Sequence, residues 1–185
     1  MATIRSITAQ LKDGREVTIR GATEDDSENL LSCMKVIFDD GEGVVLLPEE
    51  FKRTAEKQRE VIREHLTGEQ SLLLLAIVDS TIVGMLDFAT PKGKRFSHTG
   101  TFGMTLLPAF RSLGLGSILM DALIRWAESM PRLEKINLLV LASNERAISL
   151  YRKFGFVEEG RKRREVMLRE GVYDDNVLMA RMLRT

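Results

Sequence analysis

The chain has 185 residues, of which 44% are hydrophobic and 29% are charged. These values are ordinary for one soluble globular domain with a proper core. Lysine plus arginine number 27 and aspartate plus glutamate also number 27, so the near-zero net charge argues against a dedicated nucleic-acid binder, which would usually be basic.

Cys33 is the only cysteine, so a disulfide framework is excluded, and this suits a reducing cytosol. It falls inside a helical pattern, where we interpret it as a small packed residue. No stretch reaches the ~20 apolar residues that a transmembrane helix needs. We therefore expect a cytoplasmic protein that does not bind membranes.

The N-terminal residues predict a hairpin that leads into the first strand of the core. Asp13-Gly14, placed between alternating flanks at residues 10–20, is a strong turn signal. We treat residues 1–15 as an N-terminal hairpin extension and residues 16–185 as the core of a single domain.

Two helices are predicted before the central strands. Thr23, with Asp26 three residues later, resembles a capping box and opens a helix that runs to about residue 38. Pro48 is well placed for the first turn of a second helical region, which ends at Gly68. An acidic loop with glycines separates the two helices.

The rest of the chain alternates strands and helices. Residues 71–78 are almost wholly apolar, as in a strand that is buried on both faces. One helix is predicted to stop before Pro131, and another begins at Asn144 and ends at Gly155, a good left-handed helix end. The predicted strands cover residues 16–20, 71–78, 81–89, 98–107, 135–141, 156–168 and 173–183. This order predicts a mixed α/β fold of about seven strands with crossover connections.

The loop between the fourth strand and the following helix has the features of an anion site. It contains Arg111, Gly114 and Gly116. Glycines let the backbone approach a ligand closely, and the first N–H groups of a helix have no partner within the helix. Because the positive end of the helix dipole lies behind them, a phosphate group fits there.

Two common phosphate-binding loops do not match. A Walker loop ends in Gly-Lys-Ser/Thr, whereas Gly116 is followed here by Ser117 and Ile118. A dinucleotide fingerprint needs a third small residue where this chain has Leu119. It also normally lies in the first strand–helix unit, whereas this loop follows ~110 residues.

A third loop type does match. Residues 111–116, R-S-L-G-L-G, resemble the Arg/Gln-x-x-Gly-x-Gly/Ala loop of the GNAT superfamily of acyl-CoA N-acyltransferases. Residues 144–156, N-E-R-A-I-S-L-Y-R-K-F-G-F, resemble the Asn-x-x-Ala-x-x-Leu-Tyr-x-x-x-Gly-Phe segment of the same superfamily, in the right order and separation. Residues 173–179 are similar to the last strand of relatives that acetylate small amines or protein amino groups. The resemblance runs from about residue 16 to the end and is sharpest over residues 104–160.

The resemblance implies a GNAT-like sheet, mixed but mostly antiparallel, with helices on both faces. It also implies a V-shaped split between the fourth and fifth strands, residues 98–107 and 135–141. Acetyl-CoA, the acetyl donor, would lie in that split. Main-chain groups of Met104 and Leu106 would bond the pantetheine, and the N–H of Leu106 would bond the acetyl oxygen as an oxyanion site.

The resemblance further implies which residues hold the donor's phosphates. Main-chain N–H groups of residues 112–117 would hold the pyrophosphate, and Arg111 would order the loop or bind charge. Asn144 would bond the cofactor arm, and it is also a good helix N-cap, so the two roles can coexist. The predicted cofactor-binding residues are Met104, Leu106, Arg111, Ser112, Leu113, Gly114, Leu115, Gly116, Ser117 and Asn144. No cysteine–histidine cluster suggests a metal site.

Tyr151 matches the superfamily tyrosine that lies near the thioester sulfur. An unperturbed phenol has a pKa of ~10 and a thiol has a pKa of ~8.5, so a tyrosine can keep its proton until the leaving thiolate needs one. We therefore predict that Tyr151 is catalytic. A core tyrosine with a satisfied hydroxyl is the alternative.

The general base stays open. An amine with a pKa of ~10 must lose a proton before it attacks a thioester. Many superfamily members carry a glutamate in the fourth strand, where this chain has T-F-G at residues 101–103 and no acid. Asp87 on the neighbouring strand could act through a water. Asp40 or Glu42 could act from the loop after the first helix, and His98 is a candidate that also suits an ordinary surface position.

The implied function is an N-acetyltransferase that moves an acetyl group from acetyl-CoA to a primary amine, either a small molecule or a protein N-terminus. The amine would attack directly in a ternary complex, and the protein could be a homodimer. Residues 39–47 and the turn near Gly171 would build the acceptor pocket, where Asp39, Asp40 and Glu42 would suit a cationic amine. The missing strand glutamate motivates the alternative, a catalytically weak CoA-binding sensor or interaction module.

Two further features lie in the last two predicted strands. The basic run at residues 161–164, R-K-R-R, could attract an anion such as the 3′-phosphate of CoA, or it could be the solvated face of a strand. Met167, Met179 and Met182 have core-like positions in the same strands.

Overall fold

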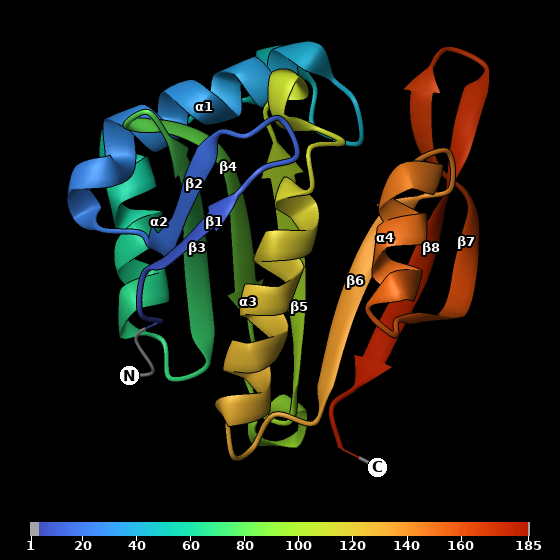
Figure 1. Cartoon of the computed structure of the whole chain (residues 1–185). Helices are drawn as coiled ribbons and strands as arrows, with labels where there is room; N and C mark the ends of the chain where they lie inside the picture. The colour runs from blue at the N-terminus through green and yellow to red at the C-terminus, as the bar shows by residue number, and fades with distance from the viewer. Residues whose placement is uncertain (1–3, 185) are drawn as a thin grey trace.

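The computed structural model describes residues 4–184. Eight strands form one sheet in the order β1-β2-β3-β4-β5-β6-β8-β7 (Figure 1). The strands are β1 (Ile7–Gln10), β2 (Glu16–Gly21), β3 (Ser71–Val78), β4 (Thr81–Ala89), β5 (Thr99–Leu106), β6 (Lys135–Leu141), β7 (Val157–Arg169) and β8 (Val172–Met182). The helices are α1 (Ser27–Asp40), α2 (Ala55–Thr67), α3 (Leu115–Ser129) and α4 (Glu145–Lys153). The predicted mixed, mostly antiparallel sheet is confirmed, and the strand beyond the predicted seven is β1 of the N-terminal hairpin.

Helices cover both faces of this sheet, and β3 is therefore buried on both of its faces. Leu72 and Leu74 belong to a hydrophobic cluster with α3 and α4, whereas Leu73 and Leu75 belong to a second cluster with α1 and α2. This division follows from the two-residue period of a strand. Cys33 lies in the second cluster, where burial raises the pKa of its thiol to about 12, so it is a packed residue as predicted.

The β5–β6 pair gives the sheet its split. The two strands pair in parallel over only three residues each, Thr99–Thr101 with Lys135–Asn137. Both strands continue beyond this pairing, β5 to Leu106 and β6 to Leu141. Figure 1 shows them close together at one end and diverging toward the other. The V-shaped split therefore lies between the two strands that the sequence predicted.

The two N-terminal helices begin at different signals. Thr23 and Asp26 form the predicted capping box, and α1 then runs to Asp40 and ends at Gly41, which has a φ of 74°. Pro48 begins only one 3₁₀ turn, and α2 starts later because the Thr54 hydroxyl caps it by accepting a hydrogen bond from the Lys57 N–H. No helix within residues 4–184 is both long and apolar enough to span a bilayer.

The β7–β8 hairpin corrects one prediction about the core. Met179 is buried, but Met167 and Met182 are 60% and 56% exposed. The outer part of the hairpin, where Met167 pairs with Tyr173, extends beyond α4, the helix that covers its base (Figure 1). Met182 is the last residue of β8, at the opposite end of the strand. The alternation of apolar and polar residues along these strands therefore does not predict a buried face over their whole length.

Candidate active site

The split between β5 and β6 contains a cavity of about 800 Å³. Segments far apart in the sequence build its walls: β5 and the loop after it, β6, α4, and the loop after α1. The predicted site residues that line it are Met104, Leu106, Arg111, Ser112, Gly114, Gly116, Ser117, Asn144 and Tyr151. Leu113 and Leu115 do not line it, because their side chains pack in the hydrophobic core. The fold thus gathers nearly all of the predicted residues around one space.

The main chain of β5 presents unpaired polar groups to this cavity. The Leu107 N–H donates a hydrogen bond of 2.9 Å to the Val83 carbonyl on the β4 side. Main-chain groups of alternate residues point to opposite edges of a strand, so those of Met104 and Leu106 point away from β4 and into the split. Pairing with β6 has already ended at Thr101. This free edge can hydrogen-bond an extended ligand as a further strand would.

The loop between β5 and α3 presents a group of free N–H donors. Gly114 is the N-cap of α3 with a φ of 90°, and Ser112 has a φ of 63°. In the part of the chain that the structure describes, the main-chain N–H groups of residues 112–116 donate to no backbone carbonyl. The Ser117 N–H, also predicted to bind phosphate, instead donates to the Gly114 carbonyl. Clustered free donors at a helix N-terminus form an anion site.

The charges that line the cavity also favour an anion. They are four cations, Lys12, Arg111, Arg146 and Lys153, and one carboxylate, Glu42. Lys12, Arg146 and Lys153 were not among the site residues predicted from the sequence. The Lys12 N–H donates to the Leu113 carbonyl at 3.0 Å, so the N-terminal hairpin forms part of the glycine loop's surroundings. Arg146 and Lys153 occupy positions of the second motif where any residue is allowed, so the motif does not mark them as site residues.

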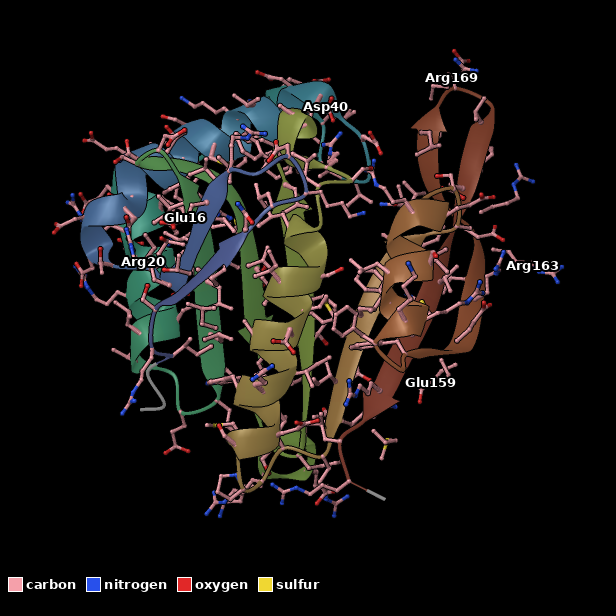
Figure 2. All side chains as sticks on the ribbon, in the orientation of Figure 1. Glu16, Arg20, Asp40, Glu159, Arg163 and Arg169 are labelled. Carbon is pink, nitrogen blue, oxygen red and sulfur yellow. The ribbon has the colours of Figure 1, made fainter. Side chains whose placement is uncertain are left out.

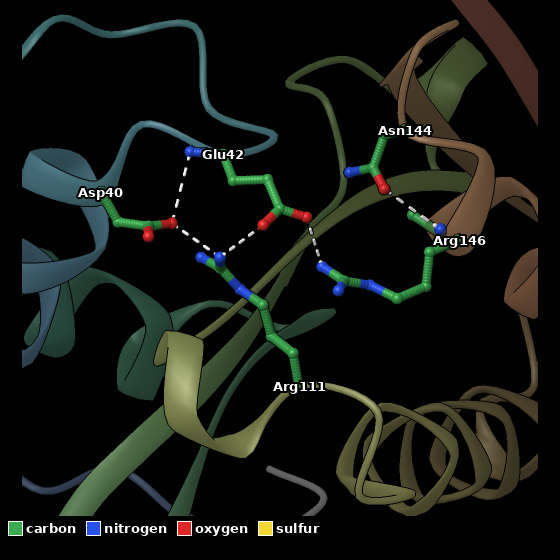
Figure 3. A network of polar contacts seen from close by, with 6 residues as sticks. Asp40, Glu42, Arg111, Asn144 and Arg146 are labelled. Carbon is green, nitrogen blue, oxygen red and sulfur yellow. Dashed lines mark hydrogen bonds and ion pairs between the residues drawn. The ribbon is translucent and has the colours of Figure 1, made fainter.

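Figure 3 shows the polar contacts of Asp40, the last residue of α1, and of Glu42 in the loop after it. Asp40 lies 2.6 Å from Arg111, and Glu42 lies 2.8 Å from the same guanidinium. Glu42 also lies 2.6 Å from Arg146 on α4. Arginines therefore neutralise Asp40 and Glu42, two of the three acids that would suit a cationic amine. Asp39 does not line the cavity.

Asn144 joins the loop after α1 to the start of α4. Its Oδ1 accepts a hydrogen bond of 3.1 Å from the Ala147 N–H, which confirms the helix-capping role. Its Nδ2 faces Gly43, where an added Cβ would come within 2.7 Å of that nitrogen. Gly43 also has a φ of 75°, so both its conformation and its surroundings require glycine.

Tyr151 is fixed by aromatic neighbours beside the split. Its ring lies edge-on to Phe102, with centroids 5.5 Å apart, and tilted against Phe156 at 6.1 Å. Burial raises the pKa of the Tyr151 hydroxyl to about 12. The phenol therefore keeps its proton throughout the physiological pH range and can donate a hydrogen bond to a ligand in the cavity.

The four candidate bases have different surroundings. Asp40 and Glu42 are engaged by arginines, as described above. His98 is exposed and lines neither of the two cavities described here. Asp87 lines a second cavity of about 170 Å³, which lies on the α1 side of β4 and β5.

Two segments of the last hairpin do not reach the main cavity. The turn at Gly171 contributes none of the described residues that line it, so the role of this turn in an acceptor pocket stays a prediction. In the basic run, Arg161 pairs with Glu158 at 3.3 Å and Lys162 pairs with Glu165 at 3.0 Å. Figure 2 shows Arg163 pointing outward from β7. The run is the solvated face of a strand.

Sequence comparisons identify relatives over most of the chain. A family model described as the acetyltransferase (GNAT) family matches residues 37–156. L-amino acid N-acetyltransferase AaaT of Escherichia coli is 34% identical over 109 residues, which cover 59% of this chain and 67% of that protein. An N-alpha-acetyltransferase of Saccharolobus solfataricus is 27% identical, with 95% of this chain and 98% of that protein covered.

Solved structures have the same fold. The acetyltransferase of GNAT family from Streptococcus pneumoniae has a TM-score of 0.86 and 26% identity, and the match covers 90% of this chain and 99% of that one. The structure of yncA from Salmonella typhimurium with its cofactor acetyl-CoA has a TM-score of 0.76 and 16% identity. That match covers 91% of this chain and 95% of that one.

Proposed function

Because the chain belongs to the GNAT acetyltransferase family and is an acyl-CoA-dependent N-acyltransferase, we propose that it acetylates a primary amine by direct attack in a ternary complex. The donor is acetyl-CoA, and the acceptor is a small molecule or a protein N-terminus. The observation that carries the proposal is the cavity in the β5–β6 split, where a free strand edge, free N–H donors and cations meet.

Donor binding would use the main chain more than side chains. The N–H groups of residues 112–116 would hold the pyrophosphate, with Lys12, Arg146 and Lys153 supplying positive charge near the phosphates. Met104 and Leu106 would hydrogen-bond the pantetheine along the free edge of β5. This arrangement suits a long, flexible polyanion, because a preformed edge and loop fix its path without large rearrangement.

The chemical step would need two groups from this chain beside the thioester. The Leu106 N–H would stabilise the oxyanion that forms when the amine attacks the carbonyl carbon. Tyr151 would donate a hydrogen bond to the sulfur as the carbon–sulfur bond breaks. Because burial raises the pKa of Tyr151 to about 12, well above the ~8.5 of an ordinary thiol, a hydrogen bond to the departing thiolate is favoured over complete proton transfer.

Acceptors with an apolar group next to the amine suit this site. The apolar side chains of Phe38, Val44, Val45 and Leu46 line the main cavity at the end of α1 and in the loop after it. Of the two relatives described above, one is named as an L-amino acid N-acetyltransferase and the other as an N-alpha-acetyltransferase. Amino acids and peptide N-termini are therefore the first acceptors to test.

A thiol-release screen with acetyl-CoA tests the proposal. The panel holds L-amino acids, peptides with free N-termini, polyamines and aminoglycosides. Amine-dependent release of CoA is expected with at least one class. Tight CoA binding without release from any class would instead support a CoA-binding sensor.

A further inference from the structure

Asp87 lies beside the strand segment that would hold the acetyl group. It pairs with Gly103 in the β4–β5 register, one residue before Met104. A Cβ added at Gly103 would come within 2.9 Å of the Asp87 Oδ1. The carboxylate therefore leans over β5, into space that only a glycine at residue 103 leaves open.

The small cavity beside this carboxylate adjoins the main site. Ile37, Phe38, Gly103, Met104 and Thr105 line both cavities, so the two share a wall. A volume of about 170 Å³ accommodates several waters at the roughly 30 Å³ that each occupies in the liquid. Among the described residues that line the small cavity, Asp87 is the only ionisable one.

The charges around Asp87 suit a proton acceptor. Burial raises its pKa, while the electrostatic effects of the nearby His65 and Arg53 side chains act in the opposite direction. The α1 side chains that line the cavity, Met34, Ile37 and Phe38, are uncharged. By contrast, Asp40 and Glu42 are held by arginines and are poorly placed to accept a proton.

We propose that Asp87 is the general base that accepts the proton of the attacking amine through one water. The inference rests on the proposed acetyl transfer. Neighbouring strands lie ~4.8 Å apart, so an amine at the far edge of β5 is about one water away from a carboxylate over its near edge.

The proton transfers balance within this arrangement. The protonated amine passes one proton to the water, and the water passes one to the Asp87 carboxylate. The freed nitrogen lone pair forms the carbon–nitrogen bond. The nitrogen then loses its second proton to solvent water as the carbon–sulfur bond breaks and releases the CoA thiolate, and Asp87 returns its own proton to solvent.

The test compares Asp87→Asn with Asp79→Asn across pH, using an acceptor from the thiol-release screen. Asp79 lies in the turn at the other end of the β4 strand and lines neither cavity. We expect Asp87→Asn to lower kcat/KM about 100-fold at pH 7, within the range for general bases. The loss should shrink as pH rises toward the pKa of the amine, because solvent then deprotonates the acceptor. Asp79→Asn should match the wild type throughout.

A stability measurement separates catalysis from folding. Because the folded-state pKa of Asp87 is raised, its charged form destabilises the fold above that pKa, so Asp87→Asn should be at least as stable as the wild type at pH 7. Unchanged activity, or a loss of equal size at every pH, would overturn the assignment. A wild type that acetylates no amine would refute the proposed function itself, and the base with it.

Discussion

Glu42 and Arg146 form a 2.6 Å ion pair that connects the loop after α1 to α4 across the main cavity. The partners are 104 residues apart in sequence, and Glu42 also binds Arg111 of the glycine loop. One carboxylate thus occupies two guanidiniums in a cavity suited to a polyanion. We infer that Glu42 competes with the donor's phosphates for these cations.

Glu42→Gln should therefore tighten CoA binding. Removing one negative charge several ångströms from a bound polyanion should make the free energy of CoA binding more favourable by roughly 1 kcal/mol, which is about fivefold in affinity. Calorimetric titration with CoA at low and high salt measures the effect, which salt should reduce. Glu49→Gln, an exposed site that does not line the cavity, is the matched control. Weaker binding in Glu42→Gln would mean that the pair holds the loop in its binding conformation.

Tyr151→Phe should lower kcat about 10- to 100-fold and leave the affinity for acetyl-CoA unchanged, because the hydroxyl acts on the departing sulfur. Since burial raises the pKa of Tyr151 to about 12, its hydroxyl stays protonated between pH 6 and 10. The ratio of wild-type kcat to Tyr151→Phe kcat should therefore be constant over this range. Steady-state kinetics with the thiol-release assay check both points. Tyr173→Phe, on the outer hairpin, serves as the control. A rise in KM alone would remove Tyr151 from the chemical step.

Asp26→Asn should destabilise the fold by about 2 kcal/mol at pH 7. Arg20 donates two hydrogen bonds to Asp26, of 2.7 and 2.8 Å, and Thr23 donates two more. Burial acts to raise the pKa of Asp26, but these hydrogen bonds outweigh it, so the folded-state pKa is lowered.

This shift gives the prediction a definite pH dependence. A lowered folded-state pKa contributes stability above the unfolded value of ~3.9 and loses it as pH falls through the folded value. Urea unfolding at pH 7 and pH 3 should show wild type and Asp26→Asn converging at the lower pH. Asp25→Asn, at an exposed neighbouring position, should have no effect at either pH. A difference at pH 3 as large as that at pH 7 would contradict the role of the carboxylate charge.

The fold could be predicted from the sequence, and so could most of the residues that line the main cavity around the two motifs, because their signals are local. Residues 111–116 and residues 144–156 are short motifs, and the apolar strands before them are continuous. The structure brings both motifs to one cavity with the predicted split between them.

The acceptor side could not be predicted because it depends on long-range contacts. Asp40 and Glu42 looked like a free acidic pocket until the fold placed Arg111 and Arg146 against them. Asp87 could not be separated from the other candidate bases by spacing alone. Its place over Gly103 comes from strand register, which no local pattern determines.

Mass spectrometry of the acceptor detects acetyl transfer to nitrogen itself. The protein is incubated with acetyl-CoA that carries an isotopic label in the acetyl group, together with each acceptor that releases thiol. We expect labelled N-acetyl product in equal amount to the CoA released. Release of CoA with labelled acetate and unmodified amine would show hydrolysis instead, and would contradict the account.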